Sequence, residues 1–301
     1  MQQPNRKNKI ISRVTDIKLK TMNKKTFMIQ AILAACCIIT SCSSDTVDGD
    51  KEYFTRGQIA YTLEDESKIF FFDNGDGTAM VTYNRKYPIQ LNDNNQAKLT
   101  TYAGSVIIPE TFTMDGKTYR VTCVDEMAFA NNTTLTQLTL PETITTFGQG
   151  AFANCSAMTA VNIPAVIQEI PSACFAQCKK MAAFTLPEQV KTIGNLAFAN
   201  CAKASKIELN EGITTIGERA FLGCSAVREI TLPSTVSKMG GNVFYKASKL
   251  TKVHVKATTP PALQDSLGDY ISKATLYVPT GCKSAYEADK LWSKFNKIEE
   301  E

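Results

Sequence analysis

Apolar residues return at a fixed interval of 23 residues through the centre of the chain. Phenylalanine marks the interval most clearly, because it occupies one position in six successive periods: Phe129, Phe152, Phe175, Phe198, Phe221 and Phe244. In the period that begins at Leu135, Leu138 and Leu140 alternate with polar residues, which predicts a short strand with one buried face. Pro141 then ends the strand.

The second half of each period predicts another apolar segment and a turn. Ile144 and Phe147 form the segment, and residues 148–155 (GQGAFANC) predict a turn with a short helical or 3-10 piece that carries Phe152 and Cys155 inward. A unit of 23 residues cannot bury these side chains by itself, so neighbouring units must stack. The sequence therefore predicts a repeat solenoid of short parallel β-strands, turns and short helical or 3-10 segments over residues 106–249.

The outward positions of the predicted strands form two rows that we expect to face solvent. Repeat proteins bind partners on such surfaces. The candidate binding residues are Gln137, Thr139, Asn162, Thr185, Lys206, Glu208, Glu229, Thr231, Lys252 and His254. A second candidate surface is the adjoining ridge of Thr145, Gln168, Lys191, Thr214 and Ser237. Apart from an imidazole the rows hold no aromatic ring, which disfavours stacked sugars and single-stranded nucleic acid.

Two features of the rows have structural interpretations. Lys206, Glu229 and Lys252 alternate in sign, so cross-strand ion pairs explain them as well as a contact patch does. His254 ends its row beside Thr231, and no carboxylate in the adjacent coil of that row is placed to orient it. This pattern favours a solvated structural histidine over a catalytic base.

The complete period follows the pattern LxxLxLPxxIxxIGxxAFxxC, which recurs five times without a gap. It resembles the BspA-type leucine-rich repeat, and the resemblance covers about residues 106–260. The resemblance implies a surface adhesin or binding protein, since some members of that family engage host matrix proteins or other bacteria.

The flanks of the repeat predict two caps. Residues 53–105 form a β-rich N-terminal cap, because the runs 69–72 and 78–83 are separated by NGDG, which is typical of a β-hairpin. Asp73, Asn74 and Asp76 offer a calcium loop as an alternative, but no Glu follows at the closing position, so a structural turn is favoured. Residues 250–301 resemble the family's strand-plus-helix C-terminal cap, and we expect Trp292 to pack it onto the last coil.

The cysteines predict buried fillers rather than bridges or metal ligands. Ala247 replaces cysteine in the last period at a position that four earlier periods share: Cys155, Cys178, Cys201 and Cys224. Such an exchange indicates a small buried apolar side chain. Stacked side chains that point the same way rarely meet disulfide geometry, so free thiols are favoured over disulfides. A straight row does not enclose an ion, and the sequence predicts neither a metal site nor a cofactor.

Residues 1–41 have the layout of a leader with a lipoprotein signal peptide. Lys24 and Lys25 precede an apolar run, 27–40, which is too short to span a bilayer. The run leads into ITSC at 39–42, which resembles the lipobox of bacterial lipoproteins and implies lipidation of Cys42. The alternative to lipidation is an ordinary signal peptide with a chance cysteine near the cleavage site. Separately, translation could start at Met22 instead of Met1.

The segment after the anchor, residues 42–52, forms an acidic tether. It resembles the surface-export signal of Bacteroidetes lipoproteins, which implies an outer membrane lipoprotein on the cell surface. The alternative location is the periplasmic face of the membrane. The alternative role of the acidic segment is that of a solvated spacer. The formal charge of the chain is +4, but residues 1–41 hold eight basic residues and one acidic residue. The remaining chain is slightly acidic, so we predict no nucleic-acid partner.

The composition disfavours an enzyme. The chain has one histidine, His254, whereas zinc sites, Ser/His/Asp triads and Cys/His pairs all use imidazole. We therefore predict no catalytic residue. The predicted function is that of a lipid-anchored cell-surface protein in binding or adhesion to an extracellular or host protein. The alternative is a glycan-binding surface lipoprotein in nutrient uptake.

Overall fold

A computed structural model describes residues 58–62, 68–83, 90–91, 97–98 and 102–301. All of them belong to one compact unit, Asp50–Glu301. Within it, successive 23-residue coils stack with parallel strands in register, which confirms the predicted solenoid. The leader (1–41), the lipidation site Cys42, the acidic tether (42–52) and parts of the segment 53–105 lie outside the described residues.

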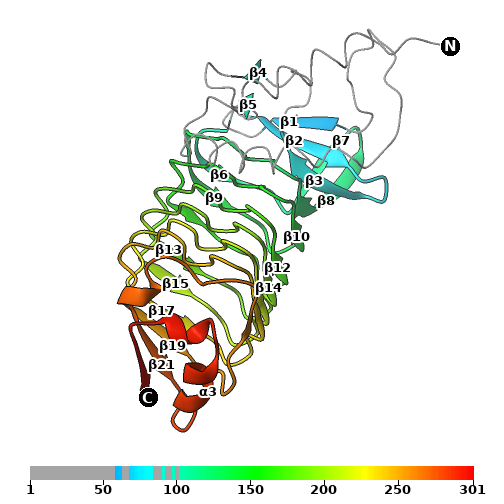
Figure 1. Ribbon diagram of the computed structural model, residues 1–301. Helices are drawn as coiled ribbons and strands as arrows, with labels where there is room; N and C mark the ends of the chain where they lie inside the picture. The colour runs from blue at the N-terminus through cyan, green and yellow to red at the C-terminus, as the bar shows by residue number, and fades with distance from the viewer. Residues whose placement is uncertain (1–57, 63–67, 84–89, 92–96, 99–101) are drawn as a thin grey trace, which may run out of the picture. The chain divides into compact units, whose positions relative to one another are not determined.

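One side of the coils carries the strands that Leu138 and Leu140 predicted, here called the first ladder (Figure 1). Its strands pair in parallel at one repeat spacing, as between Gln137 and Ala160. Three hydrogen-bonded segments make up the ladder: β6–β9–β11, β13–β15 and β17–β19–β21–β22. The strands are β6 (Gly104–Ile107), β9 (Leu135–Thr139), β11 (Ala160–Val161), β13 (Ala183–Thr185), β15 (Lys206–Glu208), β17 (Glu229–Leu232), β19 (Lys252–Val255), β21 (Thr275–Val278) and β22 (Lys297–Glu300).

A second ladder carries the apolar segment that Ile144 and Phe147 predicted. Its strands are mostly two residues long, and they also pair in parallel. They are β8 (Lys117–Val124), β10 (Thr146–Phe147), β12 (Glu169–Ile170), β14 (Thr192–Ile193), β16 (Thr215–Ile216), β18 (Lys238–Met239) and β20 (Ala262–Leu263). In four coils a glycine follows this segment. A Cβ on Gly217, for example, would lie 2.5 Å from the backbone nitrogen of Asn195 in the preceding coil, so the coils approach too closely there for a side chain.

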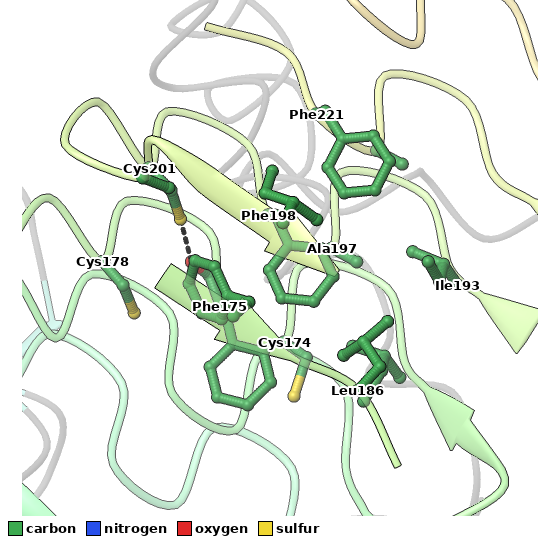
Figure 2. Close-up of a cluster of buried hydrophobic side chains, with 14 of the residues drawn as sticks. Cys174, Phe175, Cys178, Leu186, Ile193, Ala197, Phe198, Cys201 and Phe221 are labelled. Carbon is green, nitrogen blue, oxygen red and sulfur yellow. Dashed lines mark hydrogen bonds between the residues drawn. The ribbon is translucent and has the colours of Figure 1, made fainter. Parts of the chain in front are cut away.

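The third side of each coil is a turn that carries the phenylalanine. The six rings are buried and stack on one another with centroid separations of 5.1–5.9 Å, as Figure 2 shows for Phe175, Phe198 and Phe221. The backbone N–H of Phe198 donates to the carbonyl of Ala220 in the next coil at 2.9 Å, and the other turns repeat this bond. Neighbouring coils are therefore joined on all three sides.

The repeated cysteine is fully buried and donates a hydrogen bond across the coil interface. The thiol of Cys201 lies 3.1 Å from the carbonyl oxygen of Phe175 (Figure 2), and Cys155, Cys178 and Cys224 repeat the contact at 3.1–3.3 Å. In the first coil Asn132 stands at this position, and its amide donates to the carbonyl of Tyr102. The predicted buried filler is confirmed, and the seven cysteines of the described residues are free. In four coils the position also supplies a donor to a carbonyl of the preceding coil, which the alanine substitution did not reveal.

The N-terminal sheet extends the second ladder. β1 (Gln58–Thr62), β2 (Lys68–Asp73) and β3 (Thr78–Thr82) are antiparallel, and β3 pairs in parallel with β8, which forms a hairpin with β7 (Thr111–Met114). A two-stranded pair joins β4 (Gln90–Leu91) to β5 (Ala97–Lys98). In the β2–β3 turn the carboxylates of Asp73 and Asp76 accept hydrogen bonds from the backbone N–H groups of Gly75 and Thr78. These bonds support the structural turn over the calcium loop.

The C-terminal module covers the last coil with short helices and one further strand. The helices are η1 (Ile271–Lys273), α3 (Lys283–Ala288) and η2 (Trp292–Lys294). Trp292 is fully buried and its indole N–H donates to the carbonyl of Pro261 at 2.9 Å, so its predicted packing role is confirmed. The helix of the expected strand-plus-helix cap ends at Ala288, before Trp292, because the Asp289 carboxylate accepts hydrogen bonds from the N–H groups of Leu291 and Trp292 and forms a turn. β22 then adds a strand that the sequence pattern did not predict.

Candidate binding face

The exposed side of the first ladder, here called the sheet face, carries all ten candidate binding residues. Nine of them are exposed and His254 is half-buried. The alternation is explicit in β17, where Glu229 and Thr231 face solvent while Ile230 and Leu232 are buried. The structure therefore places both predicted rows on one surface, at the spacing that the parallel register imposes.

Three candidates have no side-chain partner within the described residues: Gln137, Thr139 and Thr231. Asn162 differs from them, because its amide both donates to the carbonyl and accepts from the N–H of Leu140, each at 2.7 Å. The side chain of Asn162 thus satisfies both backbone groups of Leu140, the residue that follows β9, in place of a backbone partner from the next coil. Asn162 has a structural role, and the pattern of exposed positions could not reveal this.

The middle of the sheet face is a small polar network. Lys206 lies 2.7 Å from the carboxylate of Glu208, which also accepts a hydrogen bond from the hydroxyl of Thr185 at 2.8 Å. The hydrogen bond from Lys206, followed by that from Thr185, lowers the pKa of Glu208. These side chains are exposed, so the network adds little stability. It fixes the orientation of a charged group on the surface.

His254 has two carboxylates beside it, and both come from outside its own row. Its Nδ1 lies 2.8 Å from Oε2 of Glu301, and its Nε2 lies 3.3 Å from Oε1 of Glu229 without the geometry of a hydrogen bond. The expectation of a solvated imidazole is therefore wrong, because only 16% of the side chain is exposed. The neighbours at both ring nitrogens are carboxylates, so Glu229 and Glu301 hold the imidazole between the first ladder and the C-terminal strand.

Two residues at the ends of the sheet face were missed, one half-buried and one exposed. Tyr277 on β21 pairs with His254, and the two rings stack with centroids 4.6 Å apart. The 23-residue spacing from His254 to Tyr277 was the signal that could have identified it. At the other end Ile107 pairs with Thr139 and is 63% exposed. The β7–β8 hairpin separates Ile107 from Thr139 by more than one period, so the repeat spacing could not identify this residue.

The adjoining ridge is exposed as expected, but much of it holds the coils together. The hydroxyls of Thr145, Thr214 and Ser237 each donate to a carbonyl of the preceding coil at 3.2–3.3 Å. Gln168 and Lys191 are exposed members of the same row. The sheet face is therefore the stronger candidate for partner binding.

The described residues contain no group of three or more His, Cys, Asp or Glu side chains placed to hold a metal ion. None of their helices has the length and apolar character needed to cross a membrane.

Comparison with protein families matches the chain to the BspA type leucine rich repeat region, in six copies over residues 111–201 and 149–266. These residues make up more than half of the chain. No curated protein matches it at a significant level.

Two similar solved structures share the fold. A leucine rich cell surface protein from Faecalibacterium prausnitzii A2-165 has 21% identity and a TM-score of 0.52, with 85% of this chain and 73% of that chain covered. The leucine rich repeat protein of T. pallidum has 18% identity and a TM-score of 0.51, with 81% and 94% covered.

Proposed function

Because the chain belongs to the BspA-type leucine-rich repeat family, we propose that it is a lipid-anchored cell-surface protein that binds an extracellular or host protein in adhesion. Leucine-rich repeats are typically non-catalytic binding modules, and the stacked coils present a rigid, extended surface for this purpose. The observation that carries the proposal is the sheet face, where two rows of side chains are held in register by parallel strands.

The character of the sheet face supports a protein partner. Its N-terminal part is uncharged and small, with Gln137, Thr139 and two alanines, while its C-terminal part from Lys206 onward is charged. Charged residues are depleted at the core of protein interfaces, so the uncharged N-terminal part is the expected centre of contact and the charged part its border. The ring of Tyr277 already stacks on His254, so it is engaged within the chain.

The binding surface is tested with a sheet-face variant and a control variant in a solid-phase assay on immobilised host matrix proteins. Thr139→Arg/Thr231→Arg places two bulky cations on the sheet face, and Gln149→Arg places one on the phenylalanine turn. We expect the sheet-face variant to lose at least about tenfold in affinity and the control to bind like the unchanged chain. Equal binding by all three proteins would reject the sheet face as the binding surface.

Anchoring and location are tested separately. Cys42→Ser removes the thiol that lipidation requires, so the chain should move from the detergent phase to the aqueous phase in a phase-separation assay. Protease treatment of intact cells, with a periplasmic protein as control, should remove the chain if it lies on the cell surface. Survival of the chain until the outer membrane is broken would place it in the periplasm and end the adhesin proposal.

A further inference from the structure

Positive charge gathers along one edge of the sheet face. The edge, here called the basic edge, consists of the corner and first strand residues of four consecutive coils, 177–183, 200–206, 223–229 and 246–252. These ranges contain one acidic residue, Glu229. Their basic residues are all exposed: Lys179, Lys180, Lys203, Lys206, Arg228, Lys246, Lys249 and Lys252.

This concentration opposes the charge of the rest of the protein. From residue 42 onward the chain holds 25 basic and 28 acidic residues, and eight of those basic residues lie on the basic edge. The rest of this part of the chain contains 17 basic and 27 acidic residues. Such segregation creates a local positive potential on a negatively charged molecule, and it attracts anions to one place.

Most of the basic side chains are available to a partner. Within the described residues five of them form no ion pair: Lys179, Lys180, Lys203, Arg228 and Lys249. Lys252 lies 3.9 Å from Glu229, and Lys246 lies over the ring of Tyr245. Lys206 is the one that is closely paired, with Glu208 at 2.7 Å. An approaching anion would therefore displace few existing contacts.

The coils arrange these charges in a straight track. The edge runs along the first residues of β13, β15, β17 and β19, which follow one another in Figure 1. Adjacent strands lie about 4.8 Å apart, so four coils place cations along about 14 Å. The intervening corner positions are small, with Ala202, Ser225, Ala226 and Ser248, and they leave the track open.

We propose that the basic edge binds a linear acidic polysaccharide, one that carries sulfate or carboxylate groups on successive sugar units. A stiff chain with repeated charges can contact cations from several coils at once. Seven of the eight cations are lysines, which act as point charges and suit such groups.

Other anionic partners fit less well. An extended acidic peptide presents same-side carboxylates about 6.6 Å apart, which does not match the coil spacing. The edge offers no row of free aromatic rings on which nucleic-acid bases would stack. This surface is separate from the uncharged part of the sheet face in the proposed function.

The test is surface plasmon resonance of the full chain on immobilised heparin and on neutral dextran. Lys180→Glu/Lys203→Glu/Lys249→Glu reverses three charges on the edge. Lys238→Glu/Lys290→Glu/Lys294→Glu makes the same change in net charge at exposed lysines elsewhere. The basic leader is present in every protein compared, so its contribution is constant. Thermal melting of each variant confirms that it is folded, and Lys→Gln versions of both triples serve if a reversal impairs folding.

We expect binding to heparin but not to dextran, and weakening as NaCl is raised. The edge triple should lose about a hundredfold in affinity and the control triple less than about threefold. Absence of heparin binding, or equal losses in the two triples, would overturn the proposal. Binding to polyglutamate or to phosphatidylglycerol vesicles as tight as to heparin would also overturn it, and would assign the edge to an acidic protein or to a membrane. The sheet-face variant Thr139→Arg/Thr231→Arg should keep its heparin binding.

Discussion

Among single residues, the repeated cysteines combine two properties that the coil interface requires. Each is small enough to fit beside the phenylalanine stack, and each thiol donates to the phenylalanine carbonyl of the preceding coil. Each of these carbonyls also accepts a backbone N–H of its own coil, as that of Phe175 does from Cys178 at 3.3 Å, so the thiol adds a second hydrogen bond. In the first coil an asparagine amide is the donor at the same position. The thiols are therefore structural donors.

Removing the donor should destabilise the protein more than exchanging it. Cys201→Ala removes one of the two donors to the Phe175 carbonyl, which keeps the backbone N–H of Cys178, and the lost hydrogen bond should cost about 0.5–1.5 kcal/mol. Cys201→Ser has nearly the same size as alanine but keeps an O–H donor, so it should cost less than the alanine variant. Urea unfolding of both variants measures the difference. Equal losses would show that the position is only a filler.

Burial of the thiols also predicts a loss of stability at high pH. Burial raises the pKa of Cys178 and Cys224 from 9.0 to about 12. Above about pH 9 the unfolded chain releases these protons while the folded chain keeps them, so unfolding is favoured as pH rises toward 12. At about pH 10.5 the effect is about 2 kcal/mol for each thiol.

A variant without the two thiols separates this effect from other titrations. Cys178→Ser/Cys224→Ser should lose less stability between about pH 8 and pH 10.5 than the unchanged chain, because serine does not titrate in this range. Lysine and tyrosine side chains titrate in both proteins, so their contributions to the loss of stability cancel when the two proteins are compared. Parallel urea unfolding curves at the two pH values provide the measurement, and identical losses in the two proteins would contradict the prediction.

At the scale of elements, the second ladder depends on close approach of the backbones. Its strands are two residues long, and the glycine that follows them in four coils lies against the backbone of the preceding coil. Pro171 stands at this place in one coil, so glycine is not used in every coil. In the four coils that have it, glycine leaves room for the close approach of the two backbones.

Gly217→Ala should therefore destabilise the solenoid although it adds a single methyl group. The new Cβ would lie 2.5 Å from the Asn195 nitrogen, and the coils would have to separate locally. Overpacking of this kind costs about 1–3 kcal/mol. Thermal unfolding of Gly217→Ala and of Lys238→Ala, a control at an exposed lysine on the adjacent strand β18, provides the comparison. A melting temperature equal to that of the control would show that the coil can relax.

The repeat pattern was sufficient to predict the elements inside the solenoid, because stacking forces every coil into one geometry. Leu138, Phe147 and Phe152 were each assigned to the buried side by their spacing, and all three are buried. The pattern could not predict contacts between residues far apart in the sequence. Glu301 beside His254 and the strand β22 both arise from the C-terminal chain returning to the first ladder.

For the whole molecule, stacking makes each coil depend mainly on its two neighbours, so the two ends need different structures. At the C-terminal end Trp292 packs against Tyr286, and their polar atoms donate to the carbonyls of Pro261 and Ala257. These bonds satisfy carbonyls that would otherwise meet no following coil. The stability of a solenoid is approximately a sum of local terms, so damage at one end should remain near that end.

Trp292→Phe tests this locality. The change removes the indole donor to Pro261 and part of the buried ring, and it should cost about 1–3 kcal/mol. Hydrogen exchange should become about tenfold faster or more in β21 and β22, while exchange in β14 and β16, several coils away, should stay unchanged. Lys294→Ala, an exposed change in the same 3-10 helix, should alter neither region. Faster exchange in all coils would instead show that the solenoid unfolds as one unit, in which the C-terminal module stabilises every coil together.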